Sequence, residues 1–362
     1  MCALAAACGP PKGPDGPGRG DVEARIVAAE RGRGGVTLVL VGETGERLAD
    51  LTMPPFDATE FTVDTQPAWS ADGDWVAFAS TRGRGRETRI WIAPARAEVE
   101  PRPLTDPADG AVDRDPAWSP DGRTVVFSSN RRGTYDLWRV AIDRDDDGWP
   151  RADGEPVRIT DAASDEVTPE VSPDGRALVY AVFDSDARTS SIWIGDDRGS
   201  GARQLTRGPL DQTPAWSHDG EWIAYSAPAP DRNDLDIFTI KRDGTREQRA
   251  IDEPLAHETE PAWSAGGRYL FAIAVLRNET TGAPFFWSVV FVDTNAPERV
   301  HALHDPAAVA RVGFALSPVP LDSAQLGELP LYDADTVLRA LRDLCVELPD
   351  DQRPDACKRF DR

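Results

Sequence analysis

The sequence predicts an all-β protein, namely a six-bladed β-propeller followed by a short C-terminal α-helical segment. Three observations predict this fold: a repeated motif, its spacing, and two incomplete copies that complement each other. The clearest copy, Asp113 to Phe127, holds a short strand, a Pro-Asp-Gly turn and a second run of β-branched and aromatic residues. Asp-Gly between two such runs predicts a hairpin, because glycine adopts positive φ without steric cost and aspartate tolerates it.

The motif recurs at residues 65–73, 167–175, 212–220 and 259–267. Measured at the tryptophan position, which is residue 69, 118, 171, 216 or 263, the periods are 49, 53, 45 and 47 residues. Each copy continues with a third strand, such as that around Leu137-Trp138, and a fourth that ends near a pair such as Ile159-Thr160. Four strands in a period of this size are the content of one propeller blade.

The two ends of the repeat region each carry part of a sixth blade. Strands expected at residues 24–29, 36–41 and 46–52 form a unit that lacks its first strand, whereas residues 311–318 match a first strand alone. Pairing the two fragments closes the ring and leaves no unpaired strand edge at the joint. We therefore predict a single propeller domain over residues 22–320, whose core is distributed between its blades.

These motifs resemble a known repeat family. The Pro-x-Trp-Ser-Pro-Asp-Gly core, the apolar strand after it, the Ser-Ser-Asn-Arg-Arg-Gly segment at 128–133 and the closing Leu-Thr are similar to the PD40 (WD40-like) repeat of TolB-type propellers. The resemblance covers residues 24 to 318. It implies a rigid binding platform with a channel mouth, of the kind found in bacterial envelope lipoproteins.

The charge of the chain limits its partners. Among 362 residues, 62 Asp and Glu outweigh 40 Lys and Arg, which gives a net charge of −22. Such a field repels phosphate backbones, so nucleic acids and anionic membrane surfaces are poor partners. We expect a monomer that binds a protein or a peptide.

The N-terminal segment resembles the end of a lipoprotein signal. Residues 1–8 run Met-Cys-Ala-Leu-Ala-Ala-Ala-Cys, and their small residues before Cys8 are typical of a cleavage site with Cys8 as the lipidated residue. Residues 9–21, rich in Gly and Pro, then predict a tether. The alternatives are an accidental Ala-rich start and a disordered one. On the lipoprotein interpretation the protein lies in the cell envelope, and the lipid is its only contact with the membrane.

One repeat position combines regularity with chemistry. Three residues before the repeated proline, every copy carries an acid, and the closing strand offers Arg311 nearby; the acids are Asp64, Asp113, Glu166, Asp211 and Glu258. The innermost strands of a propeller line its channel, so we expect these acids to form a collar at one mouth, where they attract a cation or a basic peptide. The alternative is that each acid accepts backbone N–H bonds within its own loop.

The sequence offers little for catalysis. His257, Glu258, Glu260 and His304 could supply ligands for a transition metal, but they lack the tight spacing of known metal motifs. No Gly-x-Ser-x-Gly elbow and no Gly-rich phosphate loop occurs in the sequence. We therefore expect a non-enzymatic protein with no cofactor other than a channel-bound cation. The alternative is a metal-dependent propeller enzyme that acts on a carbohydrate or a related small substrate.

Residues 321–362 predict a helical extension. Apolar residues between 333 and 348 recur at helical spacing, namely Val337, Leu338, Leu341, Leu344, Cys345 and Leu348. Cys345 and Cys357 would form a disulfide in an exported chain, which would stabilise the fold by roughly 3 kcal/mol. In a reducing compartment they would instead be two buried thiols.

Overall fold

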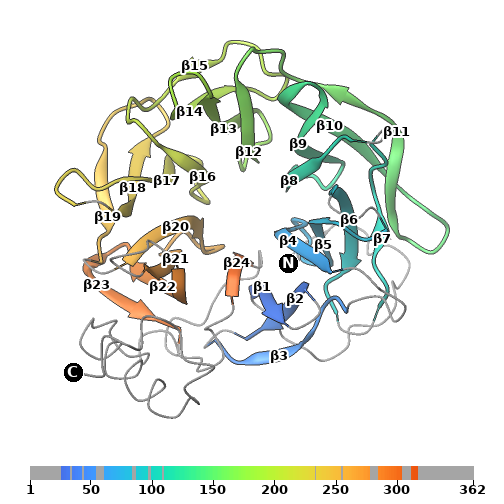
Figure 1. The fold of residues 1–362 in the computed structure, drawn as a ribbon, viewed down its shortest axis with the longest axis horizontal. Coiled ribbons are helices and arrows are strands. Elements are labelled where there is room, and N and C mark those ends of the chain that lie inside the picture. The colour runs from blue at the N-terminus through green and yellow to red at the C-terminus, as the bar shows by residue number, and fades with distance from the viewer. Residues whose placement is uncertain are drawn as a thin grey trace, which may run out of the picture.

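The computed structural model describes residues 26–316, apart from 33–34, 43–44, 54–60, 84–86, 97–98, 108–109, 233, 254–255, 278–283 and 304–310. This part of the chain contains 24 β-strands and no helix, so the protein is all-β as predicted. The strands form units of four that follow one another around a central axis (Figure 1). In the part of the chain that the structure describes, no helix is long and apolar enough to cross a membrane.

Four of the units are separate antiparallel sheets. Their strands, in chain order, are β8 (Asp113–Trp118), β9 (Thr124–Arg132), β10 (Thr134–Arg144) and β11 (Pro150–Arg158); β12 (Asp165–Val171), β13 (Ala177–Asp184), β14 (Thr189–Asp196) and β15 (Arg203–Gln204); β16 (Gln212–Trp216), β17 (Trp222–Pro228), β18 (Leu235–Lys241) and β19 (Gln248–Ile251); and β20 (Ala256–Trp263), β21 (Tyr269–Arg277), β22 (Pro284–Asp293) and β23 (Ala296–Ala302). Each unit starts with the strand that carries the repeated proline.

The remaining strands form one eight-stranded sheet that contains two further units. One unit is β4 (Thr62–Trp69), β5 (Trp75–Ser80), β6 (Arg89–Pro94) and β7 (Arg102–Pro103). The other joins the two ends of the ring and consists of β24 (Arg311–Leu316), β1 (Ile26–Gly32), β2 (Gly35–Val41) and β3 (Arg47–Asp50). Within the described residues, the backbone ladder between these units consists of two residue pairs of a parallel β2–β4 contact.

The pairing of β24 with β1 is the one predicted from the two incomplete copies of the repeat. The strands are antiparallel, and Ile26 lies opposite Leu316. In the face-on view β24 lies near the centre of the ring, beside β1 (Figure 1). The described ends of the ring therefore share one unit.

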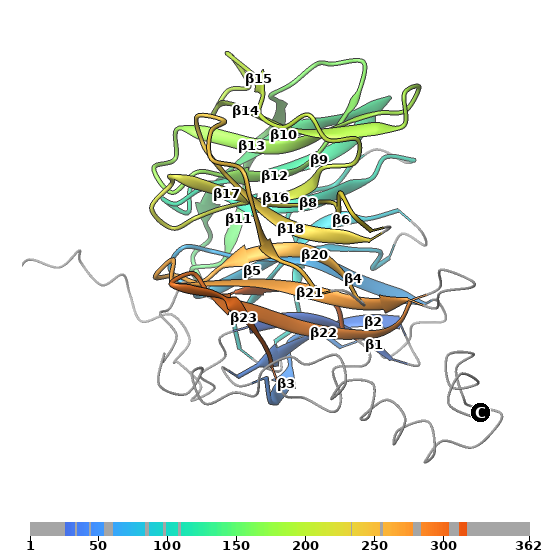
Figure 2. The same ribbon diagram turned by 90° about the vertical axis from the view of Figure 1, so that its left-hand side faces the viewer.

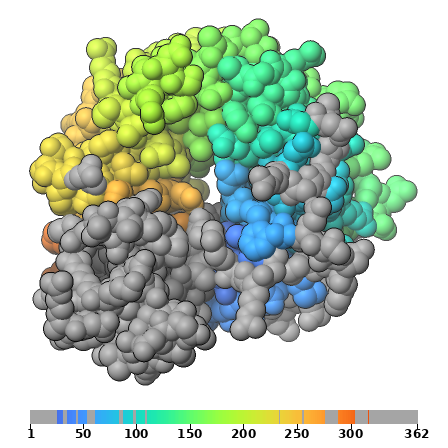
Figure 3. Space-filling view, viewed as in Figure 1, coloured from blue at the N-terminus to red at the C-terminus, as the bar shows by residue number. Residues whose placement is uncertain are grey.

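Among the described residues, the buried apolar side chains form six clusters, each between two neighbouring units. The cluster at the ring closure, for example, packs Ile26 and Val39 against Phe271 and Phe291. Seen from the side, the strands of successive units cross the molecule in layers (Figure 2). In the space-filling view the chain colours follow one another around the ring (Figure 3). Apolar burial between units, rather than one central core, therefore stabilises the fold.

The Asp-Gly turns form as predicted. In the β8–β9 turn the Ser119 hydroxyl donates to Asp121 Oδ1 at 2.6 Å and accepts the Thr124 N–H at 2.9 Å, while Gly122 has a φ of 67°. The β4–β5, β12–β13 and β16–β17 turns repeat the Ser-to-Asp bond. These aspartates stabilise turns, which accounts for their recurrence.

Each first strand from β4 to β20 contains a β-bulge beside the repeated proline. The ladder shifts register there, because two residues lie between Thr65 and Ala68 whereas one lies between their partners Ala79 and Ala77. The residue before the proline adopts positive φ in all five strands; these residues are Gln66, Asp115, Thr168, Thr213 and Glu260. Non-glycine residues rarely adopt this conformation. The bulge is therefore a built-in feature of the repeat.

Several predictions from the sequence fall outside the described residues. They concern the signal remnant with Cys8, the tether at 9–21, the helical extension at 321–362, and the pair Cys345 and Cys357. They remain predictions.

Candidate functional site

The acid of the first strand is neutralised internally in the β4–β7 unit. Asp64 is completely buried, and Arg82 donates to its two oxygens from Nε at 3.1 Å and from Nη2 at 2.6 Å. The Ser80 hydroxyl adds a third bond at 2.5 Å. The arginine reaches the acid because Asp64 pairs with Ser80 in the ladder and Arg82 follows two residues later.

The β8–β11 unit repeats this arrangement. Asp113 is also completely buried, and Arg131 Nη2 lies 2.8 and 2.7 Å from its two carboxylate oxygens. Asp113 pairs with Ser129, and Arg131 again follows two residues later. The prediction that Asp64 and Asp113 belong to an open acidic collar is therefore wrong. An arginine of the same unit forms an ion pair with each carboxylate, and both aspartates are buried from water.

The next three units keep the acid but lack this arginine. The positions equivalent to Arg82 are Asp184, Ala229 and Leu276. Among the described residues no arginine lies within ion-pair distance of the corresponding acids, which are Glu166, Asp211 and Glu258. Desolvation by burial raises the pKa of all three. The first-strand acids are therefore paired with an arginine in two units and lack one in the next three, as far as the described residues show.

Local bonds stabilise two of these three acids only in part. The Gly208 N–H donates to Asp211 Oδ2 at 2.9 Å, as the alternative of a bond within the acid's own loop predicts. Burial raises the Glu166 pKa, and a bond from the Thr160 hydroxyl opposes that shift. For Glu258, repulsion by Asp236 adds to burial and raises its pKa well above the usual range.

The other predicted site residues do not assemble into a metal site in the described part of the chain. His257 and Glu260 both lie in β20, whereas His304 falls outside the described residues. No three His, Cys, Asp or Glu side chains of that part gather closely enough to bind a metal ion. Arg311 begins β24, and its backbone pairs with Glu30.

One partly buried acid was not foreseen from the repeat. Glu170 occupies the position that is alanine in the four other copies, and its Oε2 accepts the N–H of Trp216 from the neighbouring unit. Burial raises the Glu170 pKa to about 8. The departure from alanine is the sequence signal that could have revealed this residue.

A second unforeseen feature links the bulges of three units. Gln66 donates from its side-chain amide to Asp115 Oδ1 and accepts the Asp115 N–H at 3.2 Å. Asp115 Oδ2 in turn accepts the Thr168 N–H at 3.2 Å and the Ser128 hydroxyl at 2.9 Å. In the sequence, the signal for this feature is that Gln66, Asp115 and Thr168 each directly precede the repeated proline. These bonds tie three first strands together, which makes this part of the ring rigid.

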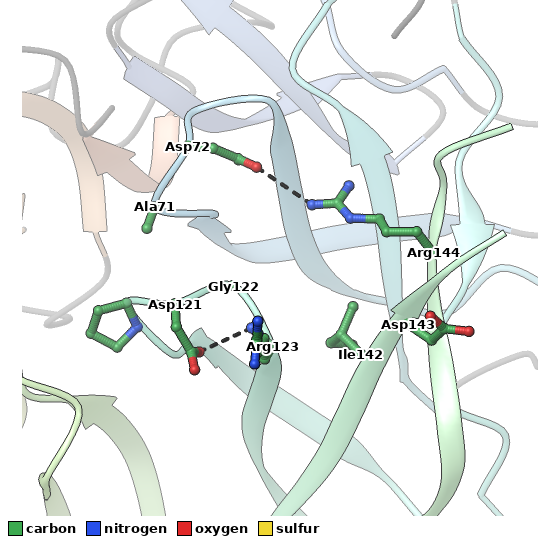
Figure 4. Close-up of a pocket in the computed structure, with 9 residues that line it drawn as sticks. Ala71, Asp72, Asp121, Gly122, Arg123, Ile142, Asp143 and Arg144 are labelled. Atoms are coloured by element: carbon green, nitrogen blue, oxygen red, sulfur yellow. Dashed lines mark hydrogen bonds and ion pairs between the residues drawn. The ribbon is translucent and has the colours of Figure 1, made fainter. Parts of the chain in front are cut away.

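A surface hollow of about 510 Å³ lies between the Asp-Gly turns of the β4–β7 and β8–β11 units (Figure 4). Arg144 Nη2 lies 3.4 Å from Asp72 Oδ2, and the Arg123 N–H donates to Asp121 Oδ1 at 3.0 Å. Asp72 thus has an arginine partner within the hollow, Asp121 is bonded by a backbone N–H of its own turn, and Asp143 pairs with Arg151 outside it. The hollow is therefore a weaker candidate than the acids of the opposite end.

Comparisons with known proteins agree on the fold. The family model described as the TolB beta propeller domain (PD40) matches residues 61–267. The chain is similar to the crystal structure of TolB from Acinetobacter baumannii, with 16% identity, 83% of this chain and 68% of that chain covered, and a TM-score of 0.62. It is also similar to an uncharacterized peptidase, YuxL, of Bacillus subtilis strain 168, at 26% identity over 177 residues. That match covers 46% of this chain and 26% of the relative, so the chain spans about a quarter of the relative's length.

The expectation of a non-enzymatic protein is wrong as a general statement. The YuxL relative is named as a peptidase. A puromycin-hydrolyzing peptidase of Mycobacterium tuberculosis has a similar fold, with 19% identity, a TM-score of 0.51, and 77% of this chain and 44% of that chain covered. Propellers of this type therefore also occur in enzymes.

The family assignment rests on the part of the chain where the repeats are most regular. The matched residues make up more than half of the sequence and include all five copies of the motif. The four-stranded units and the bulged first strands recur through the same region. The chain belongs to the TolB β-propeller (PD40) family.

Proposed function

We propose that the protein is a six-bladed propeller that binds another protein or a peptide at the end of the ring where the first strands begin. The six four-stranded units supply the blades, and β24 with β1, β2 and β3 supplies the closing one. The binding surface lies over the units from β12 to β23. The bound protein or peptide can be either a lasting partner or a substrate.

The observation that carries this proposal is the excess of acids in that sector. Beside Glu258, two arginines are shared by four aspartates. Arg232 Nη2 lies 2.9 Å from Asp236 Oδ1 and 2.6 Å from Asp252 Oδ1, and Arg249 contacts Asp236 and Asp252 as well. The four aspartates are Asp231, Asp234, Asp236 and Asp252. A positively charged partner would supply the missing counter-charge.

Two of these aspartates can meet a partner directly. The Asp231 side chain is 60% exposed and that of Asp252 is 38% exposed, whereas Asp236 is completely buried. We call Asp231 and Asp252 the acidic surface. Such rim charges mainly affect the rate of encounter and its dependence on salt.

Binding of a lysine-rich peptide tests the proposal. Asp231→Asn/Asp252→Asn should weaken binding of octalysine about 5-fold or more at low salt, measured by calorimetry. The control Asp72→Asn/Asp143→Asn removes two comparably exposed, arginine-paired acids from the other end of the strands. Equal losses in both double variants would reduce the effect to net charge and would overturn the proposed location.

We further propose that the protein lies in the bacterial cell envelope, anchored by a lipid on Cys8, and that its partner is an envelope protein. The composition of residues 1–21 and the family support this location. In a bacterial host, metabolic labelling with palmitate should mark the full chain, and Cys8→Ala should abolish the label. A label that survives this substitution would exclude lipidation at Cys8.

A further inference from the structure

One copy of the repeat lacks its tryptophan. The first strands of four units end in Trp69, Trp118, Trp216 and Trp263, whereas β12 ends in Val171. Each of these tryptophans packs into the core between its own unit and the preceding one; Trp118, for example, joins Trp75 and Ala77. The junction between the β8–β11 and β12–β15 units therefore lacks the first-strand indole ring that four other junctions contain, although Trp193 of β14 packs at its margin.

That junction also has the smallest core of the six. It contains four buried residues, Val126, Leu137, Leu178 and Tyr180, and the residues packed at its margin are Ile159, Val171, Val182 and Trp193. The other five clusters contain nine to twelve buried residues each. Fewer buried apolar side chains therefore fill this junction than any other junction in the described part of the ring.

A hollow of about 280 Å³ opens at this place. Val126, Val171 and Leu178 form its apolar wall. The volume is close to the lower limit of about 300 Å³ for small-molecule pockets, so it suits a ligand of one or two rings. The indole N–H groups of Trp118, Trp216 and Trp263 find no hydrogen-bond partner among the described residues. Packing alone therefore stabilises a ring at the equivalent positions.

The charged residues around the hollow are mostly acids. They are Asp121, Asp174 and Asp197, opposed by Arg139. Hydroxyl bonds from Ser119 and Ser172 lower the pKa of Asp121 and of Asp174, so both are ionised at neutral pH. Arg242 Nη1 lies 3.9 Å from Asp174 Oδ2 and offsets part of this charge. The rim remains negative.

We propose that this hollow binds a small ligand with a flat aromatic ring and a positively charged group. The ring takes the place of the missing indole against Val126, Val171 and Leu178, and the cation meets the acids of the rim. The Asp-Gly turns that surround the hollow follow directly after the C-terminal ends of the first strands. The site is therefore at the opposite end of the ring from the acidic surface and is independent of it.

Tryptamine is the probe, and calorimetry on the full chain is the measurement. Tryptamine should bind at least 5-fold more tightly than indole-3-propionate, which presents the same ring with the opposite charge. Val171→Trp restores the repeat and fills the hollow, so it should weaken tryptamine binding at least 10-fold and raise the melting temperature. The control Leu48→Trp adds the same ring in β3 of the closing unit, at a residue that is 39% exposed and does not line the hollow, and it should leave binding unchanged.

A second variant keeps the test valid if Val171→Trp does not fold. Asp197→Asn removes one rim charge without altering the core, and it should weaken tryptamine binding at least 3-fold while leaving the binding of neutral indole unchanged. Three results would overturn the proposal: no tryptamine binding to the unaltered chain, unchanged binding by a folded Val171→Trp variant, or equal affinity for tryptamine and indole-3-propionate.

Discussion

Replacement of Arg82 by leucine should lower the free energy of unfolding by about 3–5 kcal/mol, because it leaves the Asp64 carboxylate buried without a counter-charge. The side chains of Arg82 and Asp64 are 3% and 0% exposed, and their closest atoms are 2.6 Å apart. The Ser80 hydroxyl alone cannot balance a full charge in this position. Denaturant unfolding at neutral pH measures the loss.

Two variants separate this effect from a general loss of packing. Arg151→Leu breaks an ion pair whose members are 61% and 51% exposed, and such pairs contribute about 0–1 kcal/mol. Arg82→Leu/Asp64→Asn removes the buried charge and should recover at least half of the loss. If the double variant is no more stable than Arg82→Leu, the charge on Asp64 is not the cause.

The second large effect depends on pH and concerns Glu170. Its folded pKa of about 8 exceeds the usual value of 4.5 because of burial. A raised carboxyl pKa stabilises the fold at low pH, and this contribution is lost as the pH rises through about 8. Glu170→Ala lacks that loss, so between pH 5 and pH 9 its stability should gain about 2–4 kcal/mol relative to the unaltered chain. The side chain keeps some exposure to solvent, which reduces the effect below that of complete burial.

Glu170→Gln is the matched variant, since it removes the titration and keeps an acceptor for the Trp216 N–H. It should show the same gain without the cost of a lost hydrogen bond, about 1 kcal/mol. Glu155→Ala, at an exposed position of β11, should show no such gain. Parallel stability curves for Glu170→Gln and the unaltered chain would place the Glu170 pKa near its ordinary value.

The sequence predicts the fold because each repeat contains residues that specify its own strands and turns. Asp121-Gly122 specifies a turn, the runs around it specify strands, and the complementary fragments at the two ends specify the β24–β1 pairing. The bulge could have been read from the same motif, since proline cannot donate to the ladder and favours a disruption beside it.

The candidate site was harder to predict, because acids at the same position of the repeat have different neighbouring side chains in different units. Asp113 and Asp211 occupy one repeat position, but only Asp113 has an arginine two residues beyond its ladder partner. That difference becomes visible only when the register of the neighbouring strand is known. Glu170 depends similarly on Trp216 of another unit, 46 residues away in the sequence.

The β24–β1 joint also has a consequence for how the protein is made. Ile26 and Leu316 are 290 residues apart, so β1 leaves the ribosome long before its partner strand exists. At about 5–20 residues per second, the interval is roughly 15–60 s. During that time the edge of β1 is not paired with β24, and the side chains of Ile26 and Ala28 lack part of their final packing. The nascent chain therefore depends on protection from pairing with other chains until its last strand emerges.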